Sequence, residues 1–190
     1  MFSPNFSKYN RHANASLALL APLFVLSAPA YAEQYLSVAQ AQQVLFTGAS
    51  FEAHFLTLNE QQREQIKAIS NVRQRWAEQQ IWKAFEQDKF VGWFIIDKVI
   101  GKHEFITYAT ALNADGQVQG IEIMDYRESY GSEVRLAPWR AQFHGKQKVQ
   151  NVKFNDTISN ISGATLSCRN VTNGVKRLLA IHQLFLVTAV

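Results

Sequence analysis

Two patterns in the sequence predict an α+β fold, in which helices pack on an antiparallel β-sheet. Three successive segments rich in Val, Ile, Phe, Tyr and Thr are each bounded by turn residues, which is typical of an antiparallel β-meander. Near the C-terminus, apolar residues recur at three- and four-residue steps, which is typical of an amphipathic helix. The chain has 190 residues, 47% of them hydrophobic, so it is long enough to bury a core of its own.

The three predicted strands span residues 91–100, 105–112 and 117–126. Residues 101–104 and 113–116 connect them, and the second connection ends in Gly116, which tolerates the positive φ of hairpin turns. The amphipathic helix is predicted over residues 166–185. Gly174 lies inside it, and a helix tolerates glycine there when it packs closely against a neighbour.

Residues 33–82 are predicted to form an N-terminal helical segment of the same domain. Apolar residues at helical spacing predict a first helix over residues 36–46. Asn59 begins a capping-box pattern, which predicts a second helix over residues 60–70. Residues 73–82 are expected to begin in that helix and to finish as a strand.

The N-terminal residues have a composition of their own. Lys8 and Arg11 form a basic region, residues 16–26 are apolar, and residues 30–32 read Ala-Tyr-Ala. This pattern predicts a secretory signal peptide that is cleaved after Ala32, so that the rest of the chain is exported to the periplasm. An uncleaved membrane anchor is the alternative, although the apolar stretch is short for a membrane span.

Charge and cysteine content exclude several classes of protein. Without Lys8 and Arg11, the excess of basic over acidic residues falls from four to two, so no nucleic-acid partner is expected. The single cysteine, Cys168, cannot form an internal disulfide, and covalent haem and iron–sulfur ligation lack their thiolates. We expect Cys168 to be a small buried thiol; a reactive thiol at a helix start is the alternative.

The most informative motif is Ser162-Gly163-Ala164-Thr165-Leu166-Ser167, directly before the predicted C-terminal helix. Gly163 and Ala164 leave room for a close approach to the backbone. The start of a helix presents unpaired N–H groups and the positive end of the helix dipole, which favours binding of an anion such as phosphate. Ordinary capping of a helix by hydroxyl side chains is the alternative interpretation.

Ser-Gly-Ala-Thr, followed two residues later by Ser, resembles the flavinylation motif of the FMN-binding domain family. Such domains also occur in the flavin-carrying subunits of the Na+-pumping NADH:quinone reductase and of Rnf complexes. In that family, a flavin transferase uses FAD and Mg2+ to join FMN through its phosphate to the last threonine of the motif. The resemblance implies a covalent FMN on Thr165, with the phosphate and ribityl chain lined by Ser162, Gly163, Ala164 and Ser167.

Two further segments resemble the family. Arg127-Glu128-Ser129-Tyr130-Gly131 resembles a Glu-Ser/Thr-x-Gly loop that lies against the flavin ring. This implies that Glu128 accepts a hydrogen bond from a ring N–H and that Tyr130 stacks on or shields the isoalloxazine; a polar surface loop is the alternative. Lys102 and His103 match a third segment, where a cation near the ring favours the reduced, anionic flavin; a solvated turn is the alternative.

One position departs from the family's pattern. Many members carry Asp three residues before the Ser of the motif, and this chain has Ser159 there, with Asp156 three residues further back. If the transferase recognises that Asp, we expect flavinylation of this chain to be slower or to need a variant transferase.

Together these observations predict one FMN-binding domain over residues 33–190, with the flavin at one end of the sheet, acting as an exported electron carrier. No residue spacing indicates a metal site, and no catalytic residue is expected. The expected partners are a flavin transferase and a redox protein, either a membrane quinone-linked protein or a c-type cytochrome. A module that binds FMN reversibly and a small flavin-dependent reductase are the alternatives. Among the tryptophans, Trp139 is expected to approach the flavin most closely.

Overall fold

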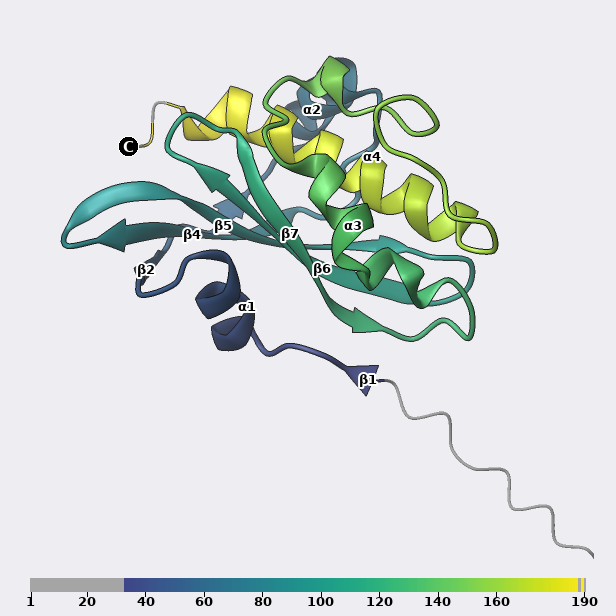
Figure 1. Cartoon of the computed structure of the whole chain (residues 1–190). Helices are drawn as coiled ribbons and strands as arrows, with labels where there is room; N and C mark the ends of the chain where they lie inside the picture. The colour runs from purple at the N-terminus through teal and green to yellow at the C-terminus, as the bar shows by residue number, and fades with distance from the viewer. Residues whose placement is uncertain (1–32, 188, 190) are drawn as a thin grey trace, which may run out of the picture. The chain divides into compact units, whose positions relative to one another are not determined.

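An antiparallel β-sheet forms the centre of the structure, a computed structural model that describes residues 33–187 and 189 (Figure 1). Six strands pair in the order β1-β7-β6-β5-β4-β2, and β3 pairs with the start of β4. The strands span Glu33–Gln34 (β1), Ser50–Ala53 (β2), Leu56–Thr57 (β3), Glu78–Glu86 (β4), Lys89–Ile100 (β5), Phe105–Asn113 (β6) and Val118–Tyr126 (β7). All pairings between these strands are antiparallel, and the predicted α+β class is confirmed.

Two helices lie between the early strands, and the other helices and turns follow the last strand. The α-helices span Val38–Leu45 (α1), Glu60–Ser70 (α2), Ala137–Arg140 (α3) and Thr165–Ile181 (α4). Short 3-10 turns span Ser132–Arg135 (η1), Ala141–Phe143 (η2) and Val149–Asn151 (η3), and a π-helical turn, His182–Leu186 (η4), continues α4. The predicted C-terminal helix is therefore confirmed, with its last turn widened.

The local signals in the sequence act as expected at two places. Asn59 and Gln62 exchange side-chain-to-backbone hydrogen bonds of 2.9 Å, so the predicted capping box starts α2. In the β6–β7 connection, Oδ1 of Asn113 accepts from the N–H groups of Asp115 (3.0 Å) and Gln117 (2.9 Å). Gly116 completes that turn with φ of +79°.

The prediction of a helical segment over residues 33–82 is correct only in part, because strands β1, β2, β3 and the first half of β4 lie in it. The expectation that residues 73–82 begin in a helix is wrong. Asn71 takes the left-handed conformation (φ +57°) and ends α2. From Glu78 onward burial alternates, with Gln79 and Ile81 inside, which is the period of a strand.

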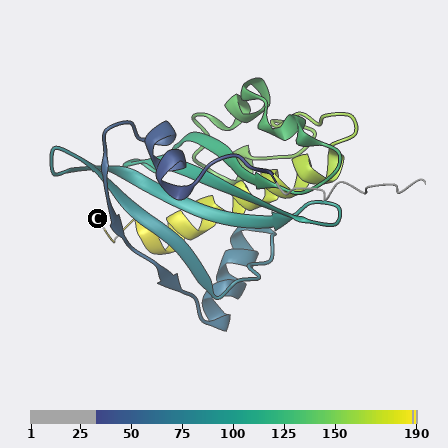
Figure 2. The same cartoon turned by 90° about the horizontal axis from the view of Figure 1, so that it is seen from below.

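The two faces of the sheet carry different layers. Helices α2 and α4 cover one face, and α1 covers the other (Figures 1 and 2). Successive residues of β5 alternate between them: Trp93 and Ile95 belong to the core cluster that includes α4, and Phe94 and Ile96 to the cluster that includes α1. This is the side-chain period of a strand buried on both faces.

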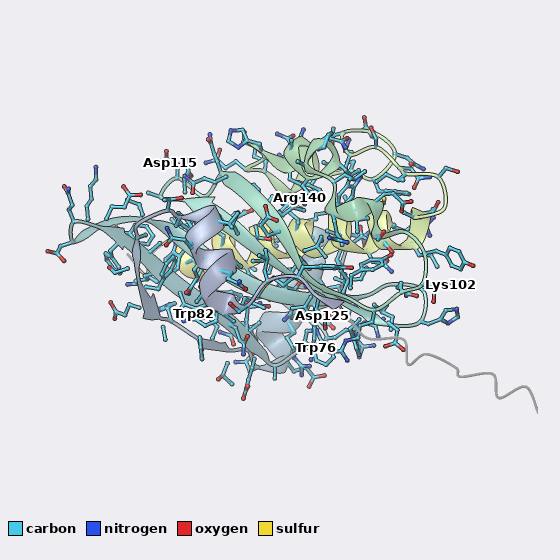
Figure 3. The ribbon with its side chains drawn as sticks, turned by 60° about the horizontal axis from the view of Figure 1, so that its bottom comes forward. Trp76, Trp82, Lys102, Asp115, Asp125 and Arg140 are labelled. Carbon is cyan, nitrogen blue, oxygen red and sulfur yellow. The ribbon has the colours of Figure 1, made fainter. Side chains whose placement is uncertain are left out.

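The meander decides which loops share an end of the sheet. In an antiparallel meander, the β5–β6 connection and the end of β7 lie at one end and the β6–β7 connection at the other. Figure 3 shows Lys102, of the first connection, and Asp115, of the second, at opposite ends accordingly. The predicted signal peptide lies outside the described residues. Within residues 33–187, no helix has the length and apolar character that a membrane crossing requires.

Candidate functional site

A cavity of about 280 Å³ lies where three segments that are distant in sequence come together. The β5–β6 connection, the loop after β7 and the start of α4 each contribute to its wall. The lining residues are Lys102, His103, Glu128, Ser129, Tyr130, Gly163, Ala164, Thr165, Leu166 and Ser167. Of the predicted flavin-binding residues, only Ser162 and Gly131 are absent from the wall, and each is the neighbour of a lining residue.

The start of α4 has no side-chain cap. Its N-cap residue is Ala164, which has no polar group, and its first turn holds no acidic residue. The first backbone hydrogen bond of the helix runs from the N–H of Cys168 to the carbonyl of Ala164 (2.9 Å). The preceding N–H groups of the first turn therefore remain as donors at the cavity, and the helix dipole adds positive potential there.

Gly163 shapes the approach to this helix start. It has φ of +83°, in the left-handed region that glycine adopts without strain, and no atom lies within 4 Å of the position that a Cβ would take. Ala164 is buried, whereas Ser162 is exposed. Gly163 thus leaves open space beside the start of α4.

Thr165 is the first helical residue of α4 and is half-buried in the cavity wall. Nδ2 of Asn160 donates to Oγ1 of Thr165 at 3.1 Å. Because this bond uses a lone pair of the hydroxyl, the O–H hydrogen remains available to a base in the cavity. Sequence reasoning missed Asn160, although an amide side chain five residues before the motif's threonine could have suggested it.

Tyr126 ties the cavity segments together, and it too was missed. Its hydroxyl, at the end of β7, donates to the carbonyl of Tyr130 (2.5 Å) and lies 3.1 Å from Oγ of Ser167. Burial raises the pKa of Tyr126, although the hydrogen bond with Ser167 acts in the opposite direction. Ser167 is itself buried, so its hydroxyl holds the loop against the helix.

Gly131 allows this contact by being small. A Cβ at Gly131 would lie 2.8 Å from the Tyr126 hydroxyl and 3.1 Å from atoms of Ala164. Its φ of +86° also lies in the left-handed region. Gly131 therefore sets how closely the loop after β7 approaches α4, rather than facing the cavity.

Glu128 organises the β5–β6 connection. Its Oε1 accepts from the backbone N–H groups of Lys102, His103 (2.6 Å) and Glu104 (3.0 Å). Burial would raise the pKa of Glu128, but these three backbone donors outweigh it and the pKa is lowered. The carboxylate thus has a positioning role beside the implied hydrogen bond to a flavin ring, which remains a prediction.

The rim of the cavity is exposed. Tyr130 is 84% exposed, and Lys102 and His103 are exposed on the opposite segment. Figure 3 shows the Lys102 side chain at this end of the sheet. An aromatic ring with so little contact of its own is available to stack on a planar ligand.

Cys168 and Trp139, the remaining candidate residues, do not line the cavity. Cys168 is fully buried and burial raises the pKa of its thiol, so the expectation of a buried thiol is confirmed over that of a reactive one. Trp139 is also buried and does not line the cavity, against expectation: its Nε1 donates to the carbonyl of Ser159 (2.8 Å). Within the described residues, no cluster of three or more His, Cys, Asp or Glu side chains is placed to hold a metal ion.

Comparison with known proteins identifies the domain. The family model of the FMN-binding domain matches residues 101–180. Residues 101–180 belong to the FMN-binding domain family. This range begins at the β5–β6 connection and ends in α4, so it contains every residue that lines the cavity.

Comparison with solved structures and with curated protein sequences adds two findings. Among solved structures, Shewanella oneidensis NqrC matches with a TM-score of 0.49 and 15% sequence identity, over 73% of this chain and 80% of that chain. No curated protein sequence matches this chain significantly.

The cavity of the FMN-binding domain fits the chemistry of FMN. The uncapped start of α4 offers donors to a phosphate, and Tyr130 offers an exposed ring beside it. The volume of the cavity lies near the lower limit of about 300 Å³ for cofactor sites.

Proposed function

We propose that this protein is an exported electron carrier whose FMN is joined by a phosphoester bond to Thr165. The observation that carries the proposal is the position of the Thr165 hydroxyl: at the mouth of an uncapped helix, in a cavity wall, with Oγ1 held by Asn160. A helix that only needed a cap would place the hydroxyl at the N-cap position, where this chain has Ala164.

The proposed attachment reaction is the one that the family resemblance implies. Oγ1 of Thr165 attacks the phosphorus of the FMN half of FAD, and a P–O bond to threonine forms. The bond from that phosphorus to the AMP half breaks, AMP leaves, and the hydroxyl proton passes to a base of the flavin transferase. Asn160 keeps a lone pair of Oγ1 engaged, so that the hydroxyl keeps one orientation during the attack.

The chain's other residues bind and orient. The N–H donors of the first turn of α4 would hold the phosphate, and the exposed ring of Tyr130 would stack on the isoalloxazine. Lys102 lines the cavity on the segment that Glu128 holds, and its cation would favour the reduced, anionic flavin. When bound, FMN supplies the exchange of one or two electrons; attachment, orientation and local charge come from the protein.

Export is proposed from the sequence pattern of residues 1–32. Outside the cytoplasm, a dissociated cofactor is lost, so a covalent bond preserves function. The redox partner is proposed to be a membrane quinone-linked protein or a c-type cytochrome, and the maturation partner a flavin transferase that requires Mg2+.

The intact mass of the protein, purified from an exporting host and measured under denaturing conditions, tests the proposal. We expect the mass of residues 33–190 increased by FMN minus water, with the increment on the peptide that contains Thr165. A yellow protein that loses its flavin in urea would instead make the domain a reversible FMN-binding module. Steady-state turnover of a small-molecule acceptor by the isolated protein would favour a flavin-dependent reductase.

A further inference from the structure

A second cavity, of about 270 Å³, lies beside the first along α4. Four cationic side chains line it, Arg73, Arg75, Lys98 and Arg177, together with the aromatic rings of Trp76 and Phe105. We call this cavity, which these six residues characterise, the cationic groove. No Asp or Glu contributes to its wall, within the part of the chain that the structure describes.

The groove and the flavin cavity share a boundary. Nδ2 of Asn170, which lines the groove, donates to the carbonyl of Ile100 (2.6 Å), directly before the connection that carries Lys102. On α4, Leu166 faces the flavin cavity and Asn170, one turn later, faces the groove. A partner seated on the groove therefore lies next to the flavin cavity.

The exposed cations of the groove lack anionic partners. Neither the Arg73 nor the Arg75 side chain forms an ion pair or hydrogen bond with a described residue, and both are exposed. The ammonium group of Lys98 lies 4.1 Å from the ring centre of Trp76 and 5.6 Å from that of Phe105. The charges of Arg73, Arg75 and Lys98 thus gather at a concave surface without an ion-pair partner among the described residues, which raises the local concentration of anions.

Buried hydrogen bonds hold the floor of the groove together. Arg177 is buried, and its guanidinium donates to Oδ2 of Asp97, which also accepts from the Tyr108 hydroxyl (2.6 Å). A second guanidinium nitrogen donates to the carbonyl of Arg73 (3.3 Å), and Nε has no partner among the described groups. Arg177 therefore anchors the segment that carries Arg73 and Arg75 to α4.

We propose that the cationic groove docks acidic side chains of the redox partner and so brings that protein to the flavin cavity. This proposal rests on the proposed electron-carrier function and names the chemistry of the partner's surface. Single exposed ion pairs contribute little and are screened by salt, so an isolated small carboxylate binds weakly here. A protein that presents several carboxylates engages Arg73, Arg75 and Lys98 together, and its approach is accelerated by the field of the groove.

A membrane surface is the less favoured occupant. The cations converge on a cavity, whereas a bilayer meets the protruding surface of a protein. The Trp76 ring is half-buried and packs on Phe105 at 5.9 Å between ring centres, so it is not free to insert among lipids.

Binding of a rhodamine-labelled peptide of eight Glu residues to the purified protein, followed by fluorescence anisotropy at low salt, tests the proposal. The test variant is Arg73→Glu with Arg75→Glu. The control is Lys89→Glu with Lys148→Glu, which changes net charge equally at exposed lysines outside the groove. We expect binding at least about tenfold weaker in the test variant than in the control.

Three results would overturn the proposal: equal binding by both variants, glutarate competing as well as the peptide per molecule, or stronger binding to vesicles of phosphatidylcholine and phosphatidylglycerol than to the peptide. None of these measurements requires the flavin, and the intact mass reports separately whether the flavin is attached. A failure of the groove and a failure of the proposed function are therefore distinguishable.

A kinetic measurement connects the groove to electron transfer. In the flavin-loaded protein, oxidation of the reduced flavin by ferricyanide, an anion, should slow about tenfold or more in the Arg73→Glu, Arg75→Glu variant. Oxidation by hexaammineruthenium(III), a cation, should not slow, and the control variant should slow neither. Equal slowing with both oxidants would contradict steering by the groove.

Discussion

The first turn of α4 and the turns that follow it are built in opposite ways. The first turn has no cap, and Thr165 and Leu166 face a cavity. From Val171 onward, the helix is buried on most sides and packs on the sheet. The missing cap costs about 1 kcal/mol of stability, which burial of a single large apolar side chain offsets. Because packing anchors the middle of α4, its first turn can keep unpaired N–H groups that are available to a ligand.

The largest expected effect separates these two regions directly. Replacing the hydroxyl at the helix start, Thr165→Ala, should abolish covalent flavin loading because the phosphoester has no attachment atom. Intact mass measures the loading, and thermal unfolding of the same sample should remain within a few degrees of the wild type, since the core is untouched. Thr165→Ser, which keeps a hydroxyl, should still load. Full loading of the Ala variant would place the attachment elsewhere.

The next effect concerns the packed middle of α4. Gly174→Ala places a Cβ 2.1 Å from the Tyr108 hydroxyl and 3.0 Å from Val99, so Tyr108 must leave its place beside Asp97. We expect a loss of about 2–3 kcal/mol in the free energy of unfolding, measured with denaturant, despite the better helix propensity of Ala.

Asn173→Ala is the control for that change, because Asn173 lies one position earlier on the same helix and is only half-buried. It should leave the free energy of unfolding within about 0.5 kcal/mol of the wild type. If both variants unfold alike, the close contact of Gly174 with Tyr108 does not matter for stability.

A smaller effect is expected from the residue that orients the acceptor hydroxyl. Asn160→Ala removes the 3.1 Å hydrogen bond to Oγ1 of Thr165 and should slow loading by up to about tenfold, with unchanged thermal stability. The rate is measured as the growth of the flavinylated mass with added transferase, FAD and Mg2+. Asn151→Ala, at the exposed last residue of η3, should load at the wild-type rate.

The smallest effect is a pH dependence of the segment that faces the helix start. The backbone donors lower the pKa of Glu128 in the folded protein, so its contribution to stability is present at neutral pH and is lost as pH falls through that lowered pKa. Wild type should exceed Glu128→Gln in melting temperature at pH 7, and the difference should shrink as pH falls below the ordinary pKa of a glutamate. Glu86→Gln, at an exposed position, should show no such difference. A difference that is independent of pH would contradict the role of the carboxylate charge.

Local chemistry explains which predictions succeeded. The capping box at Asn59, the turn at Gly116 and the apolar period of α4 each depend on neighbours within a few residues, so the sequence displays them directly. The segment 73–82 was mispredicted because its alternation begins only at Glu78. The residue that ends α2 in the left-handed conformation is Asn71 rather than Gly, so the common glycine signal for the end of a helix is missing.

The sequence by itself determined the α+β class, the meander and the motif residues 162–167 at a helix start, because period, turn residues and small hydroxylated residues are read along the chain. Only the tertiary structure decided that Lys102, Glu128 and Thr165 share one cavity. It also decided that Asn160 donates a hydrogen bond to the Thr165 hydroxyl and that Trp139 is buried in the core. Contacts between distant segments depend on how strands and helix pack, and packing leaves no periodic signal in either segment alone.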